Sequence, residues 1–345
     1  MRIVVSFLCL IISLYSCNQR PKAQDESWSS QDQVIEIIDT QGNNVRLDSA
    51  AQRVVCLFDP AIDIIYMLWA QDKLVGINME TYYDKELYDY YKHIDSRIAN
   101  KELATPGSND MLNIESAMAL KPDLIIAQNL SPNVIKTLNS MGTAVYLSTS
   151  ESYDHLMKEM EDIAVLLGKN DRGQQLINYA MDKTEQLQAR SNNHKAKAPT
   201  KNAYFSWANG RIFSTAGRNS MMNDCLVLAG VDNVCPTDID KPNINPETLI
   251  DWNPDMIVMW NDSPDLFYNK KELASVKAIQ SKQIFNLIPM FYYNPHTFKA
   301  LCVAAAINGW AYPDITINVD DEINEIITTL YGDKVGNELL KYKNL

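Results

Sequence analysis

Residue types that often carry chemistry occur in this chain, but their spacing matches no common catalytic or metal-binding motif. The four histidines are scattered, with no H-x-x-x-H pair and no nearby cluster of cysteines or carboxylates. A zinc site built by the protein alone is therefore not expected. A G-x-S-x-G motif, a phosphate-binding loop and a G-x-G-x-x-G motif are also missing from the sequence. We predict a binding protein rather than an enzyme, with no metal or cofactor of its own.

The N-terminus has the pattern of a secretion signal. Arg2 precedes an apolar run at residues 3–14 that only two serines interrupt, and a Leu-Tyr-Ser-Cys sequence ends at Cys17. The run is too short for a typical membrane span. The small residue before a cysteine resembles a bacterial lipoprotein cleavage box. We predict a signal peptide at 1–16 and a lipidated polar tether at 17–33; the alternative is an ordinary signal peptide with an incidental cysteine.

This signal places the protein in the cell envelope, anchored to a membrane by lipid and facing the periplasm or the exterior. In such a compartment, Cys225 and Cys235 could form a disulfide across a short loop. The alternative, which we favour, is that both are small buried side chains, because Cys225 lies in an apolar helical pattern. With Cys9 removed and Cys17 lipidated, the remaining cysteines are Cys56, Cys225, Cys235 and Cys302.

The length and net charge of the chain limit its architecture and the kinds of molecule that it can bind. The chain has 345 residues, of which 46% are hydrophobic, which is enough for two buried cores. Its formal net charge is −12, and we find no basic stripe along the sequence. A nucleic-acid partner is therefore excluded, because phosphate binding needs a positively charged surface. An anionic ligand would need a locally basic pocket.

An internal repeat indicates how the chain is organised. Residues 113–126 read NIESAMALKPDLII and residues 245–258 read NPETLIDWNPDMIV. The asparagine that opens each copy is a candidate N-cap, and Glu115 and Glu247 fall in the first helical turn, where the helix dipole favours a carboxylate. A Pro-Asp pair then ends each helix, and four apolar residues indicate a strand covered on both faces. Two copies predict two similar lobes.

Between the two copies, the apolar spacing predicts long helices. Residues 152–168 and 172–190 both show helical periodicity, with a break at 168–171. We predict an α/β fold with two Rossmann-like lobes joined by a long helical linker, and a ligand cleft between the lobes. The predicted division is an N-terminal lobe at 34–150, linking helices at 151–192 and a C-terminal lobe at 193–345.

Together, the lipoprotein signal, the paired repeats, the helical linker and the WAYPD sequence at residues 310–314 resemble the helical-backbone class of ABC-transporter substrate-binding proteins. That class takes up iron chelates, haem, cobalamin and some nickel complexes. The resemblance implies that Glu115 and Glu247 dock onto arginines of a membrane permease, which works with its ATPase. The alternative is that each glutamate only stabilises a helix start, worth about 0.3–1 kcal/mol.

The resemblance also implies a ligand cleft at the carboxyl ends of the strands. Guanidinium groups there would clamp an anion, aromatic rings would form flat walls, and a histidine could complete a metal's coordination. Where the family commonly has Ser-Pro after the first buried strand, this chain has Asp-Pro, which counts against a catecholate siderophore. The candidate ligand-binding residues are Asp59, Trp207, Arg211, Arg218, Trp260, Tyr292 and His296.

The resemblance therefore implies a monomeric, lipid-anchored receptor that binds an iron chelate, a siderophore or haem, and delivers it to an ABC permease. Cobalamin or a nickel complex is the alternative ligand. A chelatase-like enzyme is the alternative of another class, because similar two-lobed domains occur in such enzymes. A surface scavenger that works without a permease is a third possibility.

Overall fold

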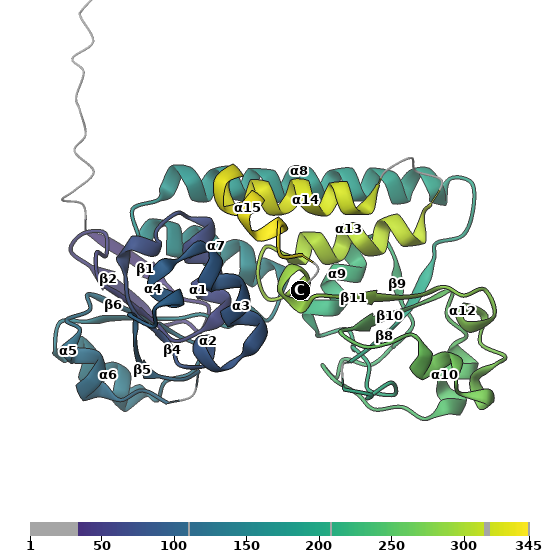
Figure 1. Ribbon diagram of the computed structural model, residues 1–345, viewed down its shortest axis with the longest axis horizontal. Coiled ribbons are helices and arrows are strands. Elements are labelled where there is room, and N and C mark those ends of the chain that lie inside the picture. The colour runs from purple at the N-terminus through teal and green to yellow at the C-terminus, as the bar shows by residue number, and fades with distance from the viewer. Residues whose placement is uncertain (1–33, 110, 208, 314–317, 344–345) are drawn as a thin grey trace, which may run out of the picture.

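The computed structural model describes residues 34–343 except 110, 208 and 314–317. Two parallel β-sheets lie at opposite ends of the molecule, and long helices run along one edge from one sheet to the other (Figure 1). This arrangement confirms the predicted α/β class with two lobes. The helices α8 (Asn170–Lys195) and α14 (Val319–Tyr331) form most of that shared edge.

The N-terminal lobe is built on a five-stranded parallel sheet with the order β5-β4-β3-β6-β7. Every residue of β6 and β7 is buried, as expected for strands covered on both faces. An antiparallel hairpin, β1 and β2, precedes the sheet. The elements are β1 (Ile35–Ile38), β2 (Asn44–Leu47), β3 (Val54–Cys56), α1 (Asp59–Met67), η1 (Gln71–Lys73), β4 (Leu74–Asn78), α2 (Glu80–Tyr83), α3 (Lys85–Ile94), α4 (Ser96–Ala99), β5 (Ala104–Gly107), α5 (Ile114–Ala119), β6 (Leu124–Ala127), α6 (Pro132–Ser140) and β7 (Ala144–Leu147).

The C-terminal lobe has a smaller parallel sheet with the order β11-β10-β8-β9. Its central strand, β10, is the apolar run of the second sequence repeat and corresponds to β6 in the first lobe. The elements are β8 (Asn202–Ser206), α9 (Met221–Leu228), β9 (Asp232–Asn233), α10 (Pro246–Trp252), β10 (Met256–Trp260), α11 (Asp265–Tyr268), η2 (Lys271–Leu273), α12 (Lys277–Gln280), β11 (Ile284–Leu287) and η3 (Met290–Tyr293).

The two repeats form the predicted helix starts. The side chain of Asn113 accepts a hydrogen bond from the backbone N–H of Ser116 at 2.9 Å, and Asn245 accepts one from Thr248 at 2.8 Å. Each asparagine therefore satisfies one of the backbone donors that a helix start leaves free. The short helices α5 and α10 then lead into buried strands.

Two helices join the lobes in sequence, α7 (Tyr153–Leu166) and α8. Between them the backbone reverses at Gly168, which has a φ of +65° and contacts Ala50 where a Cβ would sit. Glycine adopts this left-handed conformation without steric cost, so the helical pattern breaks there. The break lies within the predicted interval of residues 168–171.

The last helices return to the first lobe. After α13 (Ala300–Ala311), α14 and α15 (Asp333–Leu340) pack against α1 and α3. The indole N–H of Trp69 donates to the carbonyl of Tyr331 at 2.9 Å, and the Tyr90 hydroxyl donates to the carbonyl of Tyr342 at 3.1 Å. The end of the chain, which we expected in the C-terminal lobe, thus lies against the N-terminal lobe. The boundaries at 34–150, 151–192 and 193–345 stay predictions.

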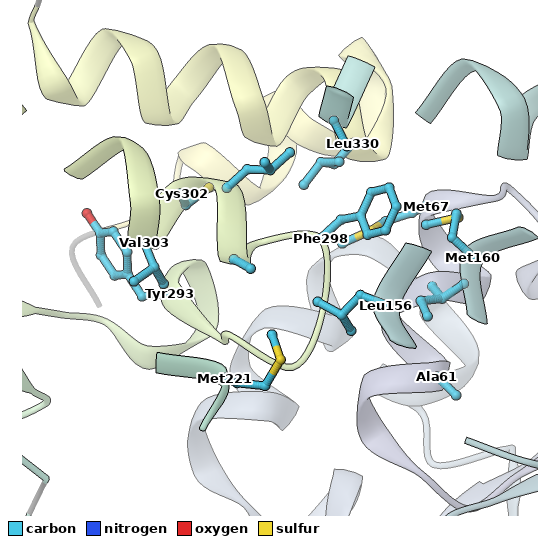
Figure 2. Packing of buried hydrophobic residues seen from close by; sticks show 14 of the residues in the cluster. Ala61, Met67, Leu156, Met160, Met221, Tyr293, Phe298, Cys302, Val303 and Leu330 are labelled. Carbon is cyan, nitrogen blue, oxygen red and sulfur yellow. The ribbon is translucent and has the colours of Figure 1, made fainter. Parts of the chain in front are cut away.

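One hydrophobic cluster runs through both lobes and the linking helices. Figure 2 shows Phe298, which precedes α13, beside Met67 of α1 and Leu156 of α7. Phe298 and Leu156 are fully buried. Because this cluster is continuous, the packing between the lobes resembles the interior of a single domain.

A buried ion pair lies within this packing. Lys299, just before α13, places its ammonium 2.8 Å from the carboxylate of Asp63 in α1, and the two side chains are only 2% and 3% exposed. The Tyr91 hydroxyl donates to the same carboxylate at 3.1 Å, and so does the Tyr331 hydroxyl. The ammonium also lies 3.7 Å from the ring centre of Phe291. Four separate elements of the chain therefore meet around one carboxylate.

Removing one charge of this pair should strongly destabilise the fold. We expect Lys299→Met to lower the free energy of unfolding by about 3–5 kcal/mol, because it leaves the Asp63 carboxylate buried without a cation. Urea unfolding followed by circular dichroism measures the change. The double variant Asp63→Asn with Lys299→Met removes both charges and should recover part of the loss.

Lys85→Met is the matched control, because Lys85 forms an ion pair with Asp89 but its side chain is 90% exposed. That change should alter the free energy of unfolding by less than about 1 kcal/mol. An equally small effect of Lys299→Met would show that the buried pair does not hold the lobes together.

Candidate ligand-binding site between the lobes

A cavity of about 200 Å³ lies between the two lobes. A second cavity of about 270 Å³ adjoins it, and Glu86 lines both. The residues that line the first cavity are Asp59, Asp63, Asp84, Glu86, Leu87 and Tyr91 from the N-terminal lobe and Trp260, Met290, Phe291, Asn294 and Lys299 from the C-terminal part of the chain. We refer to it below as the interlobe cavity.

The topology of the sheets explains why the interlobe cavity forms here. Asp59 begins α1 directly after strand β3, and Trp260 is the last residue of strand β10. Both therefore lie at the carboxyl ends of parallel strands, where open α/β sheets place their ligands. A larger cavity of about 680 Å³ lies elsewhere, between β1 and the junction of α7 and α8. It contains no residue from a strand's carboxyl end.

Carboxylates dominate the electrostatics of the interlobe cavity. Burial raises the pKa of Asp59 to about 7, and the nearby carboxylates of Glu80, Asp84 and Asp63 raise it further, while a hydrogen bond from the Thr81 hydroxyl at 3.1 Å lowers it. The Asp59 side chain is therefore about half protonated near neutral pH. This is far from the ordinary behaviour of an aspartate and is typical of a functional site.

Glu86 links the two lobes across the cavity. Its carboxylate accepts a hydrogen bond from the backbone N–H of Phe291 in η3. Burial raises the pKa of Glu86, and this hydrogen bond partly offsets the effect. Asp84 caps the start of α3 by accepting from the backbone N–H of Leu87 at 2.9 Å. Each of these carboxylates is thus held by a backbone N–H, which is local for Asp84 and comes from the other lobe for Glu86.

Aromatic rings form the wall contributed by the C-terminal lobe. Trp260 packs against Trp207 with ring centres 5.2 Å apart, and the indole N–H of Trp207 donates to the carbonyl of Thr215 at 2.7 Å. Trp207 is therefore a support behind Trp260 and does not line the cavity itself. The indole nitrogen of Trp260 is buried and has no acceptor among the described residues.

Two other predicted site residues lie near the lobe contact but not in the lining. Tyr292 is fully buried, and its hydroxyl donates to the carbonyl of Leu339 at 2.8 Å, so it joins η3 to α15. The ring nitrogen Nδ1 of His296 lies 2.9 Å from the carbonyl oxygen of Ser150. Burial lowers the pKa of His296. The predicted roles of both residues in ligand binding stay predictions.

The predicted anion clamp lies outside the interlobe cavity. Arg211 and Arg218 are exposed, and neither contributes to the cavity lining. The backbone N–H of Arg218 donates to the carbonyl of Thr237 at 2.7 Å, which directs this loop along the C-terminal lobe. The role of the two arginines in ligand binding stays a prediction. Asp59 and Trp260 are the predicted residues that the structure brings together in the cavity.

Several lining residues were missed by the sequence analysis. Asp63 and Lys299 each stand in or beside an otherwise apolar helix, and such an isolated charge is a sign of a buried pair or a functional site. Glu86 carried no comparable signal, because it lies in a polar segment rich in tyrosines. Its role depends on the contact with η3, which is far away in sequence.

The two predicted docking residues lie on one side of the molecule. Glu115 in α5 and Glu247 in α10 are both exposed. In Figure 1, α5 and α10 are at the lower edge of their lobes, opposite the edge formed by α8. A flat partner could therefore contact both glutamates at once.

The predicted lipidation site, Cys17, lies outside the described residues, as do the signal peptide and the tether. The described cysteines, Cys56, Cys225, Cys235 and Cys302, are all free and buried, which agrees with the interpretation of Cys225 and Cys235 as small core side chains. In the described ranges, no group of three or more His, Cys, Asp or Glu residues is placed to hold a metal ion. No described helix combines the length and hydropathy needed to cross a membrane.

Neutralising Asp59 should stabilise the fold in a pH-dependent way. Because the pKa of Asp59 is about 7 in the folded protein and near 4 when unfolded, the wild type loses stability as pH rises from 4 to 8. We expect Asp59→Asn to raise the free energy of unfolding by about 1–3 kcal/mol at pH 8, with a gain that shrinks toward pH 4. Urea unfolding at several pH values measures it.

Asp48→Asn is the control, since the Asp48 side chain is 95% exposed. This variant should follow the pH dependence of the wild type. If the stability of Asp59→Asn also showed the pH dependence of the wild type, the Asp59 carboxyl would titrate normally in the folded protein. The cavity would then not raise its pKa.

Comparison with known proteins agrees with this geometry. A family model described as "Periplasmic binding protein" matches residues 54–289. The uncharacterized ABC transporter substrate-binding lipoprotein YvrC of Bacillus subtilis is 21% identical over 82% of this chain and 88% of its own length. The molybdate-binding protein MolA of Haemophilus influenzae is 26% identical over 74% of this chain and 77% of its own.

A solved structure shows the same fold. The periplasmic solute binding protein of Veillonella parvula matches with a TM-score of 0.70 and 18% identity, over 89% of this chain and 97% of that one. These matches confirm the resemblance to ABC-transporter substrate-binding proteins that the sequence motifs indicated. Because the family model covers most of both lobes, the chain belongs to the periplasmic binding protein family.

Proposed function

We propose that this protein is the extracytoplasmic receptor of an ABC importer, and that it binds a metal chelate between its lobes and delivers it to the permease. The observation that carries this proposal is the interlobe cavity, which both lobes line at the carboxyl ends of their strands. A lipid on Cys17 would hold the protein at the membrane, with the polar residues 18–33 as the tether. The receptor we propose is a monomer.

An iron chelate, a siderophore or haem, is the ligand class we propose, with cobalamin or a nickel complex as the alternative. The acidic lining of the interlobe cavity argues against highly anionic chelates, which would meet the carboxylates of Asp59, Asp84 and Glu86. Lys299 is the one cationic side chain among the described residues of this lining, because Arg211 and Arg218 are not part of it. A simple oxyanion, such as the ligand in the name of MolA, is disfavoured for the same reason.

The transport cycle we propose depends on differential binding by two arrangements of the lobes. Helices α7 and α8 limit how far the lobes move, and the contacts of Asp63 with Lys299 and of Glu86 with Phe291 favour the closed arrangement. Docking of the permease on Glu115 and Glu247 would pull the lobes apart and release the ligand.

An absorption titration separates the candidate ligands. We expect one of haem, a ferric siderophore or cobalamin to give a saturable spectral change with the purified protein, because each has its own visible spectrum. Asp59→Asn and Trp260→Ala should change the affinity, since both residues line the interlobe cavity. Absence of binding by all of these and by nickel complexes would refute the receptor proposal, and turnover of a bound tetrapyrrole would favour the chelatase-like enzyme.

Charge reversal tests the docking surface. We expect Glu115→Lys combined with Glu247→Lys to abolish uptake in cells while ligand affinity stays unchanged, because both side chains are exposed and lie away from the cavity lining. Glu102→Lys combined with Glu272→Lys is the matched control, because these glutamates are also exposed, one on each lobe. Normal uptake by the first pair would show that Glu115 and Glu247 only stabilise their helices.

A further inference from the structure

We propose that the interlobe cavity selects a cationic coordination complex, seated by its positive charge among Asp59, Asp84 and Glu86. This inference rests on the proposed function and defines the charge of the ligand, which the family match leaves open. The inference is based on the charged side chains and the aromatic rings that line the cavity.

The lining has an excess of negative charge. Among the described residues of the lining, four side chains are carboxylates and Lys299 is the one cationic side chain. That ammonium is already paired with Asp63 at 2.8 Å. None of Asp59, Asp84 and Glu86 forms an ion pair with any described residue. A cation from outside would therefore meet three carboxylates without an ion-pair partner, of which Glu86 alone is partly compensated, by the more distant Lys299 ammonium.

The surroundings of these carboxylates leave the charge uncompensated. Asp59 accepts from the Thr81 hydroxyl, Glu86 from the N–H of Phe291 and Asp84 from the N–H of Leu87, and all three donors are neutral groups. The other ionisable groups around Asp59 are Asp84, Glu80, Asp63, Cys56 and Tyr91, and the ammonium of Lys299 beyond Asp63. Burial and mutual repulsion raise the pKa of Asp59 and of Glu86. A bound cation would reverse this effect.

Aromatic groups add a second, independent attraction for a cation. Tyr91, Trp260 and Phe291 line the same cavity, and the ring of Phe291 already holds the Lys299 ammonium at 3.7 Å. Aromatic faces attract cations, and the attraction strengthens when water is excluded. The Phe291 ring also stacks on Tyr90 with ring centres 4.2 Å apart, so it is already engaged, and Tyr91 and Trp260 are the rings that would contribute to holding a cation.

The indole N–H of Trp260 favours a ligand that carries hydrogen-bond acceptor atoms. Its nitrogen is buried without an acceptor among the described residues, and such a donor is normally satisfied. A bare metal ion offers no hydrogen-bond acceptor, but the ligand shell of a coordination complex does. The cavity thus fits a complex that is positive overall and carries acceptor atoms on its surface.

Two inert cobalt complexes of opposite charge test this inference directly. Isothermal titration calorimetry of the full-length chain at pH 8 would use carbonatobis(ethylenediamine)cobalt(III), which is positive, and tris(oxalato)cobaltate(III), which is trinegative; both carry ligand oxygens that accept hydrogen bonds. We expect the cation to bind at least about tenfold more tightly than the anion. The affinity for the cation should fall several-fold between pH 8 and pH 6, because Asp59 takes up a proton through its pKa of about 7.

Matched variants assign the effect to the interlobe cavity. Asp59→Asn and Glu86→Gln keep the shape of the side chain and remove its charge, and each should weaken cation binding about tenfold or more. Asp48→Asn, at a side chain that is 95% exposed, should leave it unchanged. Circular dichroism confirms that each variant is folded. An equal loss of affinity for the cation in all three variants, or no loss in Asp59→Asn, would show that the interlobe cavity is not where the cation binds.

The outcomes separate this inference from the proposed function. If the anionic probe binds as well as the cationic one or better, or if neither probe binds while a chelate binds in the absorption titration, the charge inference is wrong and the receptor proposal stands. If neither probe nor any chelate binds, both are wrong. Preferential binding of the cation that depends on Asp59 supports both.

Discussion

The buried ion pair between Asp63 and Lys299 is the constraint on which the rest of the structure depends. Taking two charges out of water is costly, and the cost is offset only when their geometry is good and further hydrogen bonds are made. Here the hydroxyls of Tyr91 and Tyr331 donate to the carboxylate, and the ring of Phe291 lies against the ammonium. The pair therefore holds α1, α3, α13 and α14 together at one point.

The same pair also lines the interlobe cavity, so the arrangement of the lobes and the shape of the site are linked. A change in how the lobes meet would move Lys299 relative to Asp63 and Phe291 relative to Glu86. In the proposed transport cycle, this link is the route by which docking on α5 and α10 would affect the site. Both helices begin at equivalent points of their lobes because the sequence repeat places them there.

The buried carboxylates of the cavity lower the stability of the folded protein. Asp59 with a pKa near 7 is less stable as an anion here than in water, and the burial of Glu86 acts in the same direction. Natural proteins accept such unfavourable groups mainly at functional sites, where a ligand relieves them. On the opposite wall, Trp260 packs against Trp207. Trp207 is itself fixed by a hydrogen bond to the carbonyl of Thr215, so this aromatic wall is rigid.

The sequence by itself determined the local elements and part of the site. Capping asparagines, the helical spacing and the apolar runs depend on near neighbours, so the repeats, the break at Gly168 and the position of Asp59 and Trp260 at strand ends were predictable. The tertiary structure alone decided which polar groups meet. Glu86 meets Phe291, and Lys299 meets Asp63, across distances in sequence that no local pattern encodes. The loop of Arg218 is directed by its backbone hydrogen bond to Thr237 and by the close packing of Gly217 against Ile239, and Arg218 does not line the cavity.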